Sequence, residues 1–377
     1  MKKILYLSRS GNFGGMEKHI LDLINSVNKD FEVHIFCNSG EMAKEYENAF
    51  AIVRIVVPTS SIDISYMKKV REYVVNNKID IVHTHELEVS ILGLLAVVDL
   101  KNVKKIMHIH TPITSWKHSL IGYLVKAPLN FIANFIVGNF VADKVVALTE
   151  SIRQERVKRE LISNSKIVLI PNAIDTGKFN VLQEQRQLFK NEILDKYQIP
   201  KDKIIIGNLS RLTREKGQDI LLNAFAKLAK NSNYHLIIAG GGELFDEYTK
   251  LIDTLNIKDS CTLTGVFEEI EKLKLYFCFD YFVFPSRAEG FGYVLVEAMA
   301  VGLPILASDL QVLKDVSKGT IEFFQSENTG ALTEKLPTFL STKYDNQALK
   351  IKYDKVLINY TFTSFKNNYL SLYKSLF

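Results

Sequence analysis

Cysteine is scarce in this sequence, with three residues in 377, and Cys37, Cys261 and Cys278 lack the short spacing of a metal-binding or redox pair. A disulfide framework and a thiolate metal site are therefore not expected. A long apolar run is also missing at the start, where the run after Met1 ends at Ser8. That length is too short for a signal peptide or a membrane span, so we expect a buried first strand in a cytoplasmic protein.

Several familiar catalytic motifs are missing as well. The sequence has no G-x-G-x-x-G, no P-loop, no H-E-x-x-H and no G-x-S-x-G, and it shows neither an internal repeat nor a low-complexity tract. The absence of G-x-G-x-x-G argues against a nicotinamide-dependent oxidoreductase. The chemistry has to come from a different set of residues.

Positive charge is unevenly distributed. Residues 1–180 hold 23 Lys and Arg against 18 Asp and Glu, whereas residues 181–377 hold 24 basic residues and 24 acidic residues. Two basic clusters, 101–105 and 153–159, fit either a solvated helix face or contact with an anionic membrane. Nucleic acid is not expected as a partner, because the net charge of +5 is modest and no nucleic-acid-binding module accompanies it.

Residues 127–142 are a candidate membrane segment. Its 16 residues carry no charge but include a proline and three asparagines. This length is short for a membrane span. We expect a helix buried in the core, with a position at the membrane interface as the alternative.

Short apolar runs alternate with amphipathic helical patterns along the whole chain, which is typical of parallel sheets with crossover helices. A polar stretch, 181–197, separates two such series. We predict two Rossmann-like α/β domains, 1–180 and 181–358, that face a deep cleft, with a C-terminal helical segment, 359–377, packing back on the first. The predicted strands are 3–8, 32–37, 52–57, 80–83, 105–110, 144–148 and 166–170, then 204–208, 234–239, 261–264, 281–284 and 305–307.

Ligands of such sheets bind at the carboxyl ends of the strands, where the candidate residues also lie. Two glycine loops, 11–15 and 240–242, allow close approach of the backbone to an anion, although a plain turn explains each equally well. After the strand 204–208, Arg211 and Lys216 are suited to clamping a diphosphate, or are two surface cations.

Histidines are concentrated at two other strand ends. His83 and His85 lie two positions apart, as do His108 and His110, so each pair shares a face of its strand. Without a cysteine or carboxylate that completes a known ligand spacing, we do not expect a metal here. We expect His85 and His110 to bind a polar ligand.

Glu297 is the only charged residue between Gly290 and Ser308, in a helix that is otherwise apolar. An unpaired buried carboxylate is costly, so Glu297 needs a partner. With Glu289 and the glycine loop that follows it, Glu297 suits a ligand rich in hydroxyl groups, such as a sugar or a ribose. The alternative is a carboxylate satisfied internally by an arginine or by the backbone.

The segment containing both glutamates, "PSRAEGFGYVLVEAMAVGLPILAS", resembles the E-x7-E segment of the family 4 retaining glycosyltransferases, which use nucleotide-sugar donors and have the GT-B fold. The segments "LSRLTREKG", "GGMEKHILDLI", "IDIVHTHE", "IPNAID" and "FTSFKNNYLSLY" resemble further landmarks of that family in the same order. Two departures are the "DLQVLKDVSKG" stretch, which lacks a Gly-Gly turn, and Ala173, where many members have glycine.

The resemblance implies roles for individual residues. Arg211 and Lys216 neutralise the leaving diphosphate, and Glu297 binds the ribose hydroxyls. Glu289 holds hydroxyls of the donor sugar. Backbone donors come from both domains, and His110 lies near the anomeric carbon. The implied nucleotide-sugar-binding residues are Gly14, Gly15, Arg211, Lys216, Glu289, Gly290, Phe291, Gly292 and Glu297.

These roles predict a retaining glycosyltransferase that needs neither cofactor nor divalent metal, since fixed cations stabilise the charge that grows on the diphosphate. We expect a UDP-sugar as donor and a lipid-linked or growing surface glycan as acceptor, with peripheral contact to anionic membrane. The alternatives are the same fold with a soluble acceptor, as in sucrose or glycogen synthases, and a non-catalytic nucleotide-sugar-binding regulator.

Overall fold

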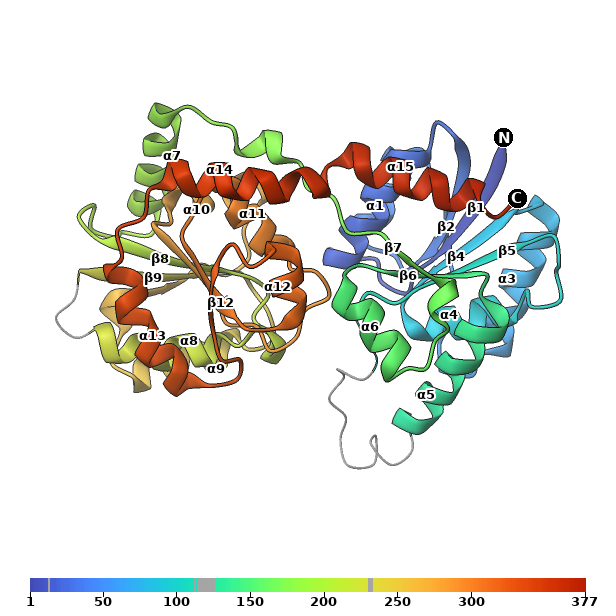
Figure 1. The fold of residues 1–377 in the computed structure, drawn as a ribbon, viewed down its shortest axis with the longest axis horizontal. Coiled ribbons are helices and arrows are strands. Elements are labelled where there is room, and N and C mark those ends of the chain that lie inside the picture. The colour runs from blue at the N-terminus through green and yellow to red at the C-terminus, as the bar shows by residue number, and fades with distance from the viewer. Residues whose placement is uncertain (13, 112, 114–125, 230–232) are drawn as a thin grey trace. The chain divides into compact units, whose positions relative to one another are not determined.

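The computed structural model describes residues 1–12, 14–111, 113, 126–229 and 233–377. These form two compact units (Figure 1), the first comprising Met1–Ala173 with Phe362–Phe377 and the second Ile174–Thr361. The predicted glycine loop 11–15 includes residue 13, which lies outside the described residues.

Unit one contains a seven-stranded parallel sheet in the order β3-β2-β1-β4-β5-β6-β7. Its strands are β1 (Lys2–Leu7), β2 (Phe31–Cys37), β3 (Ile52–Ile55), β4 (Ile81–His85), β5 (Lys104–His108), β6 (Lys144–Ala147) and β7 (Ile167–Leu169). Its helices include α1 (Gly15–Val27), α2 (Glu41–Asn48), α3 (Ile64–Asn77), α4 (Leu87–Leu95), α5 (Ala127–Ile136) and α6 (Glu150–Lys158). The inner strands are mostly buried, as expected for a parallel sheet covered on both faces, whereas the edge strand β3 has no buried residue.

The C-terminal helix α15 (Phe362–Lys374) belongs to unit one and lies along α1 (Figure 1). Phe365, Tyr369, Leu372 and Tyr373 enter the same apolar core as β1, β2, α1 and α2. The Tyr373 hydroxyl contacts the Tyr6 hydroxyl at 3.0 Å. The predicted return of the last helix to the first domain is confirmed.

Unit two contains a six-stranded parallel sheet in the order β10-β9-β8-β11-β12-β13. Its strands are β8 (Ile204–Leu209), β9 (Tyr234–Ala239), β10 (Cys261–Leu263), β11 (Tyr281–Phe284), β12 (Ile305–Ser308) and β13 (Glu322–Phe324). Its helices include α7 (Gln183–Lys196), α8 (Gln218–Ala229), α9 (Phe245–Thr254), α10 (Glu269–Cys278), α11 (Tyr293–Val301), α12 (Gln311–Ser317), α13 (Thr329–Ser341) and α14 (Asn346–Leu357). Figure 1 shows α8, α9 and α13 on one side of this sheet and α7, α10 and α14 on the other.

Two such sheets with covering helices make each unit Rossmann-like, and the pair of units has the predicted GT-B architecture. The two chain segments that connect the units are hydrogen-bonded to each other, because the Ile174 N–H donates to the Tyr360 carbonyl at 2.7 Å. All twelve predicted strands are present among the described residues, and β13 is additional.

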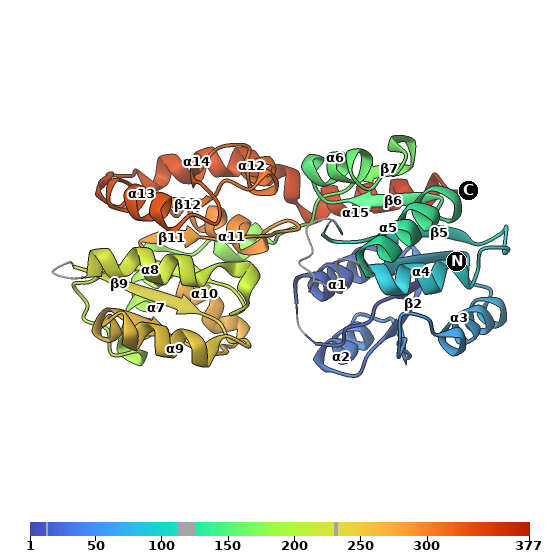
Figure 2. The same cartoon turned by 90° about the horizontal axis from the view of Figure 1, so that it is seen from below.

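The prediction for residues 127–142 is wrong in its main point. Helix α5 continues into a π-helical turn, Val137–Val141, and neither is buried in the core throughout. Leu129, Ile132, Ile136 and Phe140 are between 44% and 73% exposed. The helix lies beside α4 (Figure 2) and leaves its other face uncovered by the described residues. Across the described chain, no helix is long and apolar enough to cross a membrane.

Candidate functional site

The loop that follows β8 carries the two predicted cations. Gln218 opens α8 and is fully buried, and its side-chain amide donates to the Ser210 hydroxyl at 2.7 Å and to the Arg211 carbonyl at 2.9 Å. These bonds fix the backbone of the loop, whereas the Arg211 side chain is exposed. The guanidinium of Arg211 is therefore presented from a rigid support.

Lys216 meets Glu289, which lies 73 residues further along the chain. The Lys216 ammonium nitrogen lies 2.6 Å from Oε1 of Glu289, and the Ser286 hydroxyl donates to the same oxygen at 2.7 Å. The side chains of Lys216 and Glu289 are 21% and 7% exposed. The structure thus brings together a cation and a carboxylate that the sequence placed in separate motifs, after the neighbouring strands β8 and β11.

Arg287 connects these two loops, and it was not among the predicted site residues. Its backbone N–H donates to the Glu215 carbonyl at 2.7 Å. Its guanidinium forms two hydrogen bonds to the Asp219 carboxylate, at 2.8 and 2.7 Å. The hydrogen bonds that Arg287 donates to Asp219 raise the pKa of Arg287. Gly217 is also required here, because it has a φ of +68° and a Cβ on it would lie 2.2 Å from the Pro285 carbonyl oxygen.

The second glycine loop, residues 240–242, packs against the loop that carries Arg211. The Leu212 N–H donates to the Gly241 carbonyl at 2.9 Å. Gly240 has a φ of +144°, and a Cβ on it would lie 2.0 Å from the Ser210 carbonyl oxygen. The close approach predicted for residues 240–242 is thus to the protein's own loop around Arg211.

The loop between Glu289 and α11 ends at Gly292, the residue that precedes the helix, with a φ of +86°. No side chain of the described residues caps this helix end. Phe291 is buried and packs its ring on that of Tyr360, with centroids 5.3 Å apart. Backbone N–H groups at such a helix start are available to oxygen atoms of a ligand. Gly290, which precedes Phe291, is partly exposed.

Glu297 lies within α11 and is 5% exposed. Its two carboxylate oxygens have separate partners on α10. Oε1 lies 2.6 Å from the Lys272 ammonium nitrogen, and Oε2 accepts from the Tyr276 hydroxyl at 2.8 Å. Burial lowers the pKa of Lys272, but the charges of Glu297 and Glu269 and the hydrogen bond to Glu297 together outweigh this effect, and the net shift is upward. Burial first, and then the charge of Glu297, raise the pKa of Tyr276 well above its usual value.

Glu297 is therefore satisfied inside the protein, as the alternative interpretation held. Its partners are a lysine and a tyrosine, however, and not the expected arginine or backbone. Sequence reasoning missed both residues. A signal was present, since Lys272 and Tyr276 are four positions apart in a helical pattern and so share one face. A carboxylate has about four acceptor sites, so Glu297 retains capacity for further donors.

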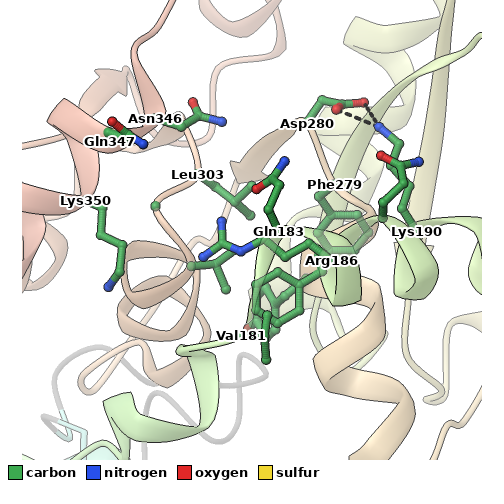
Figure 3. A pocket seen from close by; sticks show the side chains of 15 residues that line it. Val181, Gln183, Arg186, Lys190, Phe279, Asp280, Leu303, Asn346, Gln347 and Lys350 are labelled. Carbon is green, nitrogen blue, oxygen red and sulfur yellow. Dashed lines mark hydrogen bonds and ion pairs between the residues drawn. The ribbon is translucent and has the colours of Figure 1, made fainter.

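A cavity of about 530 Å³ in unit two lies elsewhere. Its lining includes Arg186, Lys190, Asp280 and Lys350 (Figure 3). Lys190 and Asp280 form an ion pair at 2.7 Å. Asp280 directly precedes β11, so this part of the cavity lies at the amino edge of the sheet, opposite the loops described above. None of the predicted site residues lines it.

Unit one gathers five histidines. His83 and His85 come from β4, His108 ends β5, and His110 follows two residues later, as the pairing predicted. His19 of α1 joins them and had not been singled out. Neighbouring rings stack or meet edge to face, with the rings of His108 and His110 4.0 Å apart.

The hydrogen bonds of this histidine cluster (His19, His83, His85, His108 and His110) are incomplete. His19 contacts Asn172 and Tyr369 at 2.6 and 3.1 Å, and Nδ1 of His83 contacts Tyr373 at 2.9 Å. Nε2 of His83, Nε2 of His85 and both ring nitrogens of His108 are buried without a hydrogen-bond partner in the described residues. Each such atom costs about 1–3 kcal/mol.

Burial keeps the histidine cluster uncharged. It lowers the pKa of His19 to about 4, against which the hydrogen bond to Asn172 acts. Burial, followed by the proximity of other histidines, lowers the pKa of His85, His108 and His110 well below the usual value. At neutral pH each ring therefore carries one N–H and one free lone pair.

A fully buried ion pair supports the backbone on either side of His110. Nη1 of Arg156 lies 2.7 Å from Oε2 of Glu160, and another guanidinium nitrogen donates to the Ile109 carbonyl. Oε1 of Glu160 accepts from the Ile113 N–H at 2.7 Å. The basic cluster 153–159 was interpreted as a solvated or membrane-facing surface, and for Arg156 that interpretation is wrong.

The first glycine loop leads into α1. Gly14 precedes the helix in an extended conformation, Gly15 is its first residue, and no side chain of the described residues caps this end. Gly15 is exposed and Gly14 partly so. The backbone N–H groups of this helix start remain the predicted donors to an anionic ligand.

Two Rossmann-like units with paired carboxylates and cations after the strands of the second define a protein of the GT-B class. Two family models match the chain: "Glycosyltransferase Family 4" over residues 13–178 and "Glycosyl transferases group 1" over residues 189–356. The chain belongs to this family of glycosyltransferases.

Curated relatives are distant. Alpha-monoglucosyldiacylglycerol synthase of Streptococcus pneumoniae is 26% identical over 69% of this chain and 59% of the relative. The matched region spans only about three fifths of the first such relatives. The O-antigen biosynthesis glycosyltransferase WclY of Escherichia coli is 23% identical over 95% of this chain and 98% of its own.

Among solved structures, Anabaena HepE in complex with UDP and glucose superposes with a TM-score of 0.84. The identity is 17%, and the match covers all of both chains. At that identity the likeness concerns the fold alone.

Proposed function

We propose that this protein is a retaining glycosyltransferase that moves a sugar from a nucleotide-diphosphate donor, a UDP-sugar, to a lipid-linked or growing surface glycan. The observation that carries the proposal is the junction of the Lys216 and Glu289 loops in unit two. There a cation for the diphosphate, a carboxylate for sugar hydroxyls and a helix start that suits ligand oxygens lie together. The UDP and glucose named for the HepE complex support the choice of donor.

In this proposal the donor's parts are divided among the residues of unit two. Arg211 and Lys216 stabilise the negative charge that grows on the departing diphosphate, which is the largest electrostatic change of the reaction. Glu289 accepts hydrogen bonds from sugar hydroxyls. The N–H groups of Phe291 and Gly292, in the loop that begins with Gly290, lie beside it in sequence and donate to the same ligand. Glu297 accepts from the ribose. For Lys216 and Glu289 the donor has to share or replace the contact that they make with each other.

The contributions of unit one follow from the family resemblance. His110 acts near the anomeric carbon of the sugar, and Gly14 and Gly15 supply backbone donors. His110 suits that place as an uncharged imidazole, because burial lowers its pKa. The two fixed cations of unit two make a divalent metal unnecessary for the charge on the diphosphate.

An exposed apolar helix face in unit one supports a lipid-linked acceptor and a location at the membrane. The exposed side chains of Leu129, Ile132, Ile136 and Phe140 follow one another at intervals of three or four residues, so they share a face. An exposed apolar helical face in a unit with excess positive charge suits an anionic membrane surface. The diacylglycerol in the name of the pneumococcal relative and the O-antigen in that of WclY support a lipid-linked glycan, with the protein in the cytoplasm at the membrane.

Calorimetric titration with UDP, GDP, ADP and NAD in excess EDTA tests the donor part. We expect selective UDP binding that persists in EDTA and weakens in Glu297→Ala. Selective binding of GDP would mean that the donor carries guanine in place of uracil, and the proposed reaction class would stand. Binding of NAD alone, or binding abolished by EDTA, would overturn the proposal. Transfer from the nucleotide-sugar so identified to total lipid extract or to a soluble sugar then separates the two kinds of acceptor.

A further inference from the structure

Four members of the histidine cluster carry ring nitrogens that all lie within 4.8 Å of one another. They are His19, His85, His108 and His110. We propose that these rings form a binding site for one late first-row transition-metal ion, of which Zn²⁺ is the physiological example. The ion is a ligand of unit one and is not a cofactor of the sugar transfer proposed above.

Unpartnered lone pairs and N–H groups are the first support. Both ring nitrogens of His108 are buried and lack a hydrogen-bond partner among the described residues. Buried polar atoms of native proteins are nearly always satisfied, so such a group calls for an explanation. A metal ion bound by one nitrogen of His108 accounts for that nitrogen. A buried water molecule is the competing explanation, and the experiment below distinguishes the two.

Spacing is the second support. Nδ1 of His85 lies 3.2 Å from Nε2 of His110. Two imidazole nitrogens bound to one tetrahedral zinc at about 2.0–2.1 Å are about 3.3–3.4 Å apart. Both rings then present a lone pair to the ion and keep the N–H on the other nitrogen. Binding therefore requires a change of tautomer in one ring and no loss of a proton.

His19 is the fourth ligand, and its surroundings already orient it. Nδ1 of His19 lies 2.6 Å from Oδ1 of Asn172, which can only accept, so this nitrogen carries the N–H and Nε2 carries the lone pair. A hydrogen bond of this kind to the second nitrogen is the usual support of a metal-binding histidine. The Tyr369 hydroxyl, 3.1 Å from Nε2, occupies that lone pair now and has to be displaced by the ion.

The ligand set selects the metal. It contains imidazole alone, with no carboxylate or cysteine in the group that the described residues form. Neutral nitrogen ligands suit Zn²⁺, Cu²⁺, Ni²⁺ and Co²⁺, whereas Mg²⁺ and Ca²⁺ require oxygen. An ion here also occupies a nitrogen of His110. If the proposed function holds, it therefore inhibits sugar transfer, and a chelator leaves transfer intact.

Cobalt is the probe for the test, because tetrahedral Co²⁺ absorbs visible light. The full-length chain, freed of metal, is titrated with CoCl₂ and then with ZnCl₂ or MgCl₂ in the absence of nucleotide. We expect one Co²⁺ per chain, displaced by Zn²⁺ and not by Mg²⁺. Loss of a ligand in His85→Gln or His108→Gln should weaken binding by at least about 10- to 100-fold. His34→Gln is the control, since His34 is buried in unit one but lies outside this group.

The wild-type protein gives a second measurement that does not depend on variants. An ion that binds only the folded state raises the unfolding temperature in proportion to the logarithm of its concentration. We expect this rise with Zn²⁺ and not with Mg²⁺. Absence of saturable Co²⁺ binding, or equal binding in His108→Gln and His34→Gln, would overturn the proposal and leave buried water as the explanation. No nucleotide-sugar is present, so this failure is distinct from failure of the proposed function.

Discussion

Lys216 and Glu289 form an ion pair at 2.6 Å that joins the loops after β8 and β11. A ligand that is anionic at one end and rich in hydroxyls at the other can separate this pair by offering each residue a new partner. In the proposed function, this ion pair keeps the cation and the carboxylate satisfied until the nucleotide-sugar binds.

Lys216→Ala is expected to lower kcat by about 100-fold, the size of effect seen when one preorganised electrostatic contact to a developing anion is removed. KM should change less, because the contact strengthens as charge develops on the diphosphate. Release of UDP from the donor measures both constants. Lys227→Ala, at an exposed lysine of α8, is the control. An unchanged kcat with a raised KM would contradict the leaving-group role.

Glu297→Ala is expected to have two effects. It removes charge-assisted hydrogen bonds to the ribose, which should weaken UDP binding by about 10- to 100-fold. It also leaves Lys272 buried without its partner, which should cost about 3–5 kcal/mol of stability. Lys272→Met breaks the same ion pair but keeps the carboxylate. Calorimetry at a temperature where both variants are folded should show weak UDP binding in the first only, and equal losses in the two would contradict the ribose role.

The sequence predicts those features of the structure that depend on residues close together in the chain. Apolar runs such as 204–208 and 234–239 identified their strands because burial on both faces requires a continuous run. β13 (Glu322–Phe324) was missed because Glu322 interrupts the apolar residues around it, so the segment shows no continuous apolar run. The E-x7-E segment was recognisable because both glutamates belong to one loop and one helix.

Partners supplied by other elements were not predictable in the same way. Lys272 reaches Glu297 from α10, and His19 reaches the other histidines from α1. The spacing of Lys272 and Tyr276 shows that these two share a helix face, but no local spacing links either Lys272 or His19 to its partner. Arg156 shows the same limit. Its neighbours in sequence are charged, and only the tertiary fold places it against Glu160 and the Ile109 carbonyl in the interior.

The histidine cluster makes stability depend on pH. Burial lowers the folded-state pKa of these rings from 6.5, to about 4 for His19, so below pH 6.5 the unfolded chain binds more protons than the folded one. Stability is therefore complete above pH 6.5 and falls as the pH drops toward 4, by up to about 1.4 kcal/mol per pH unit for each histidine.

Urea denaturation at pH 7.5 and at pH 5.5 measures this slope. The variant His83→Gln/His108→Gln should show a smaller loss of stability between the two pH values, whatever its absolute stability. Tyr369→Phe is the matched control, because it removes the hydroxyl beside His19 and retains every histidine. Equal pH dependence in the double variant and in the wild type would contradict this account.

The Arg156–Glu160 pair is expected to be a large contributor to the stability of unit one. Arg156→Met leaves the Glu160 carboxylate buried without its charge partner, which should cost about 3–5 kcal/mol in the free energy of unfolding. Arg159→Met, which breaks an exposed ion pair with Glu155 at 3.1 Å, should cost less than about 1 kcal/mol. The double change Arg156→Met/Glu160→Leu should be milder than Arg156→Met alone, because it leaves no buried charge, and the reverse order would contradict this reasoning.

The exposed face of α5 is expected to bind anionic membrane. Replacing Leu129 and Ile132, which are 62% and 52% exposed, with glutamate removes apolar contact and adds charge of the wrong sign. Each apolar side chain is worth about 1.5–3 kcal/mol when fully buried, so affinity for phosphatidylglycerol vesicles should fall at least about 10-fold. Flotation at low and at high salt measures this. Leu188→Glu, at an exposed leucine of α7 in unit two, is the control, and wild-type protein that fails to float at low salt would contradict the membrane contact.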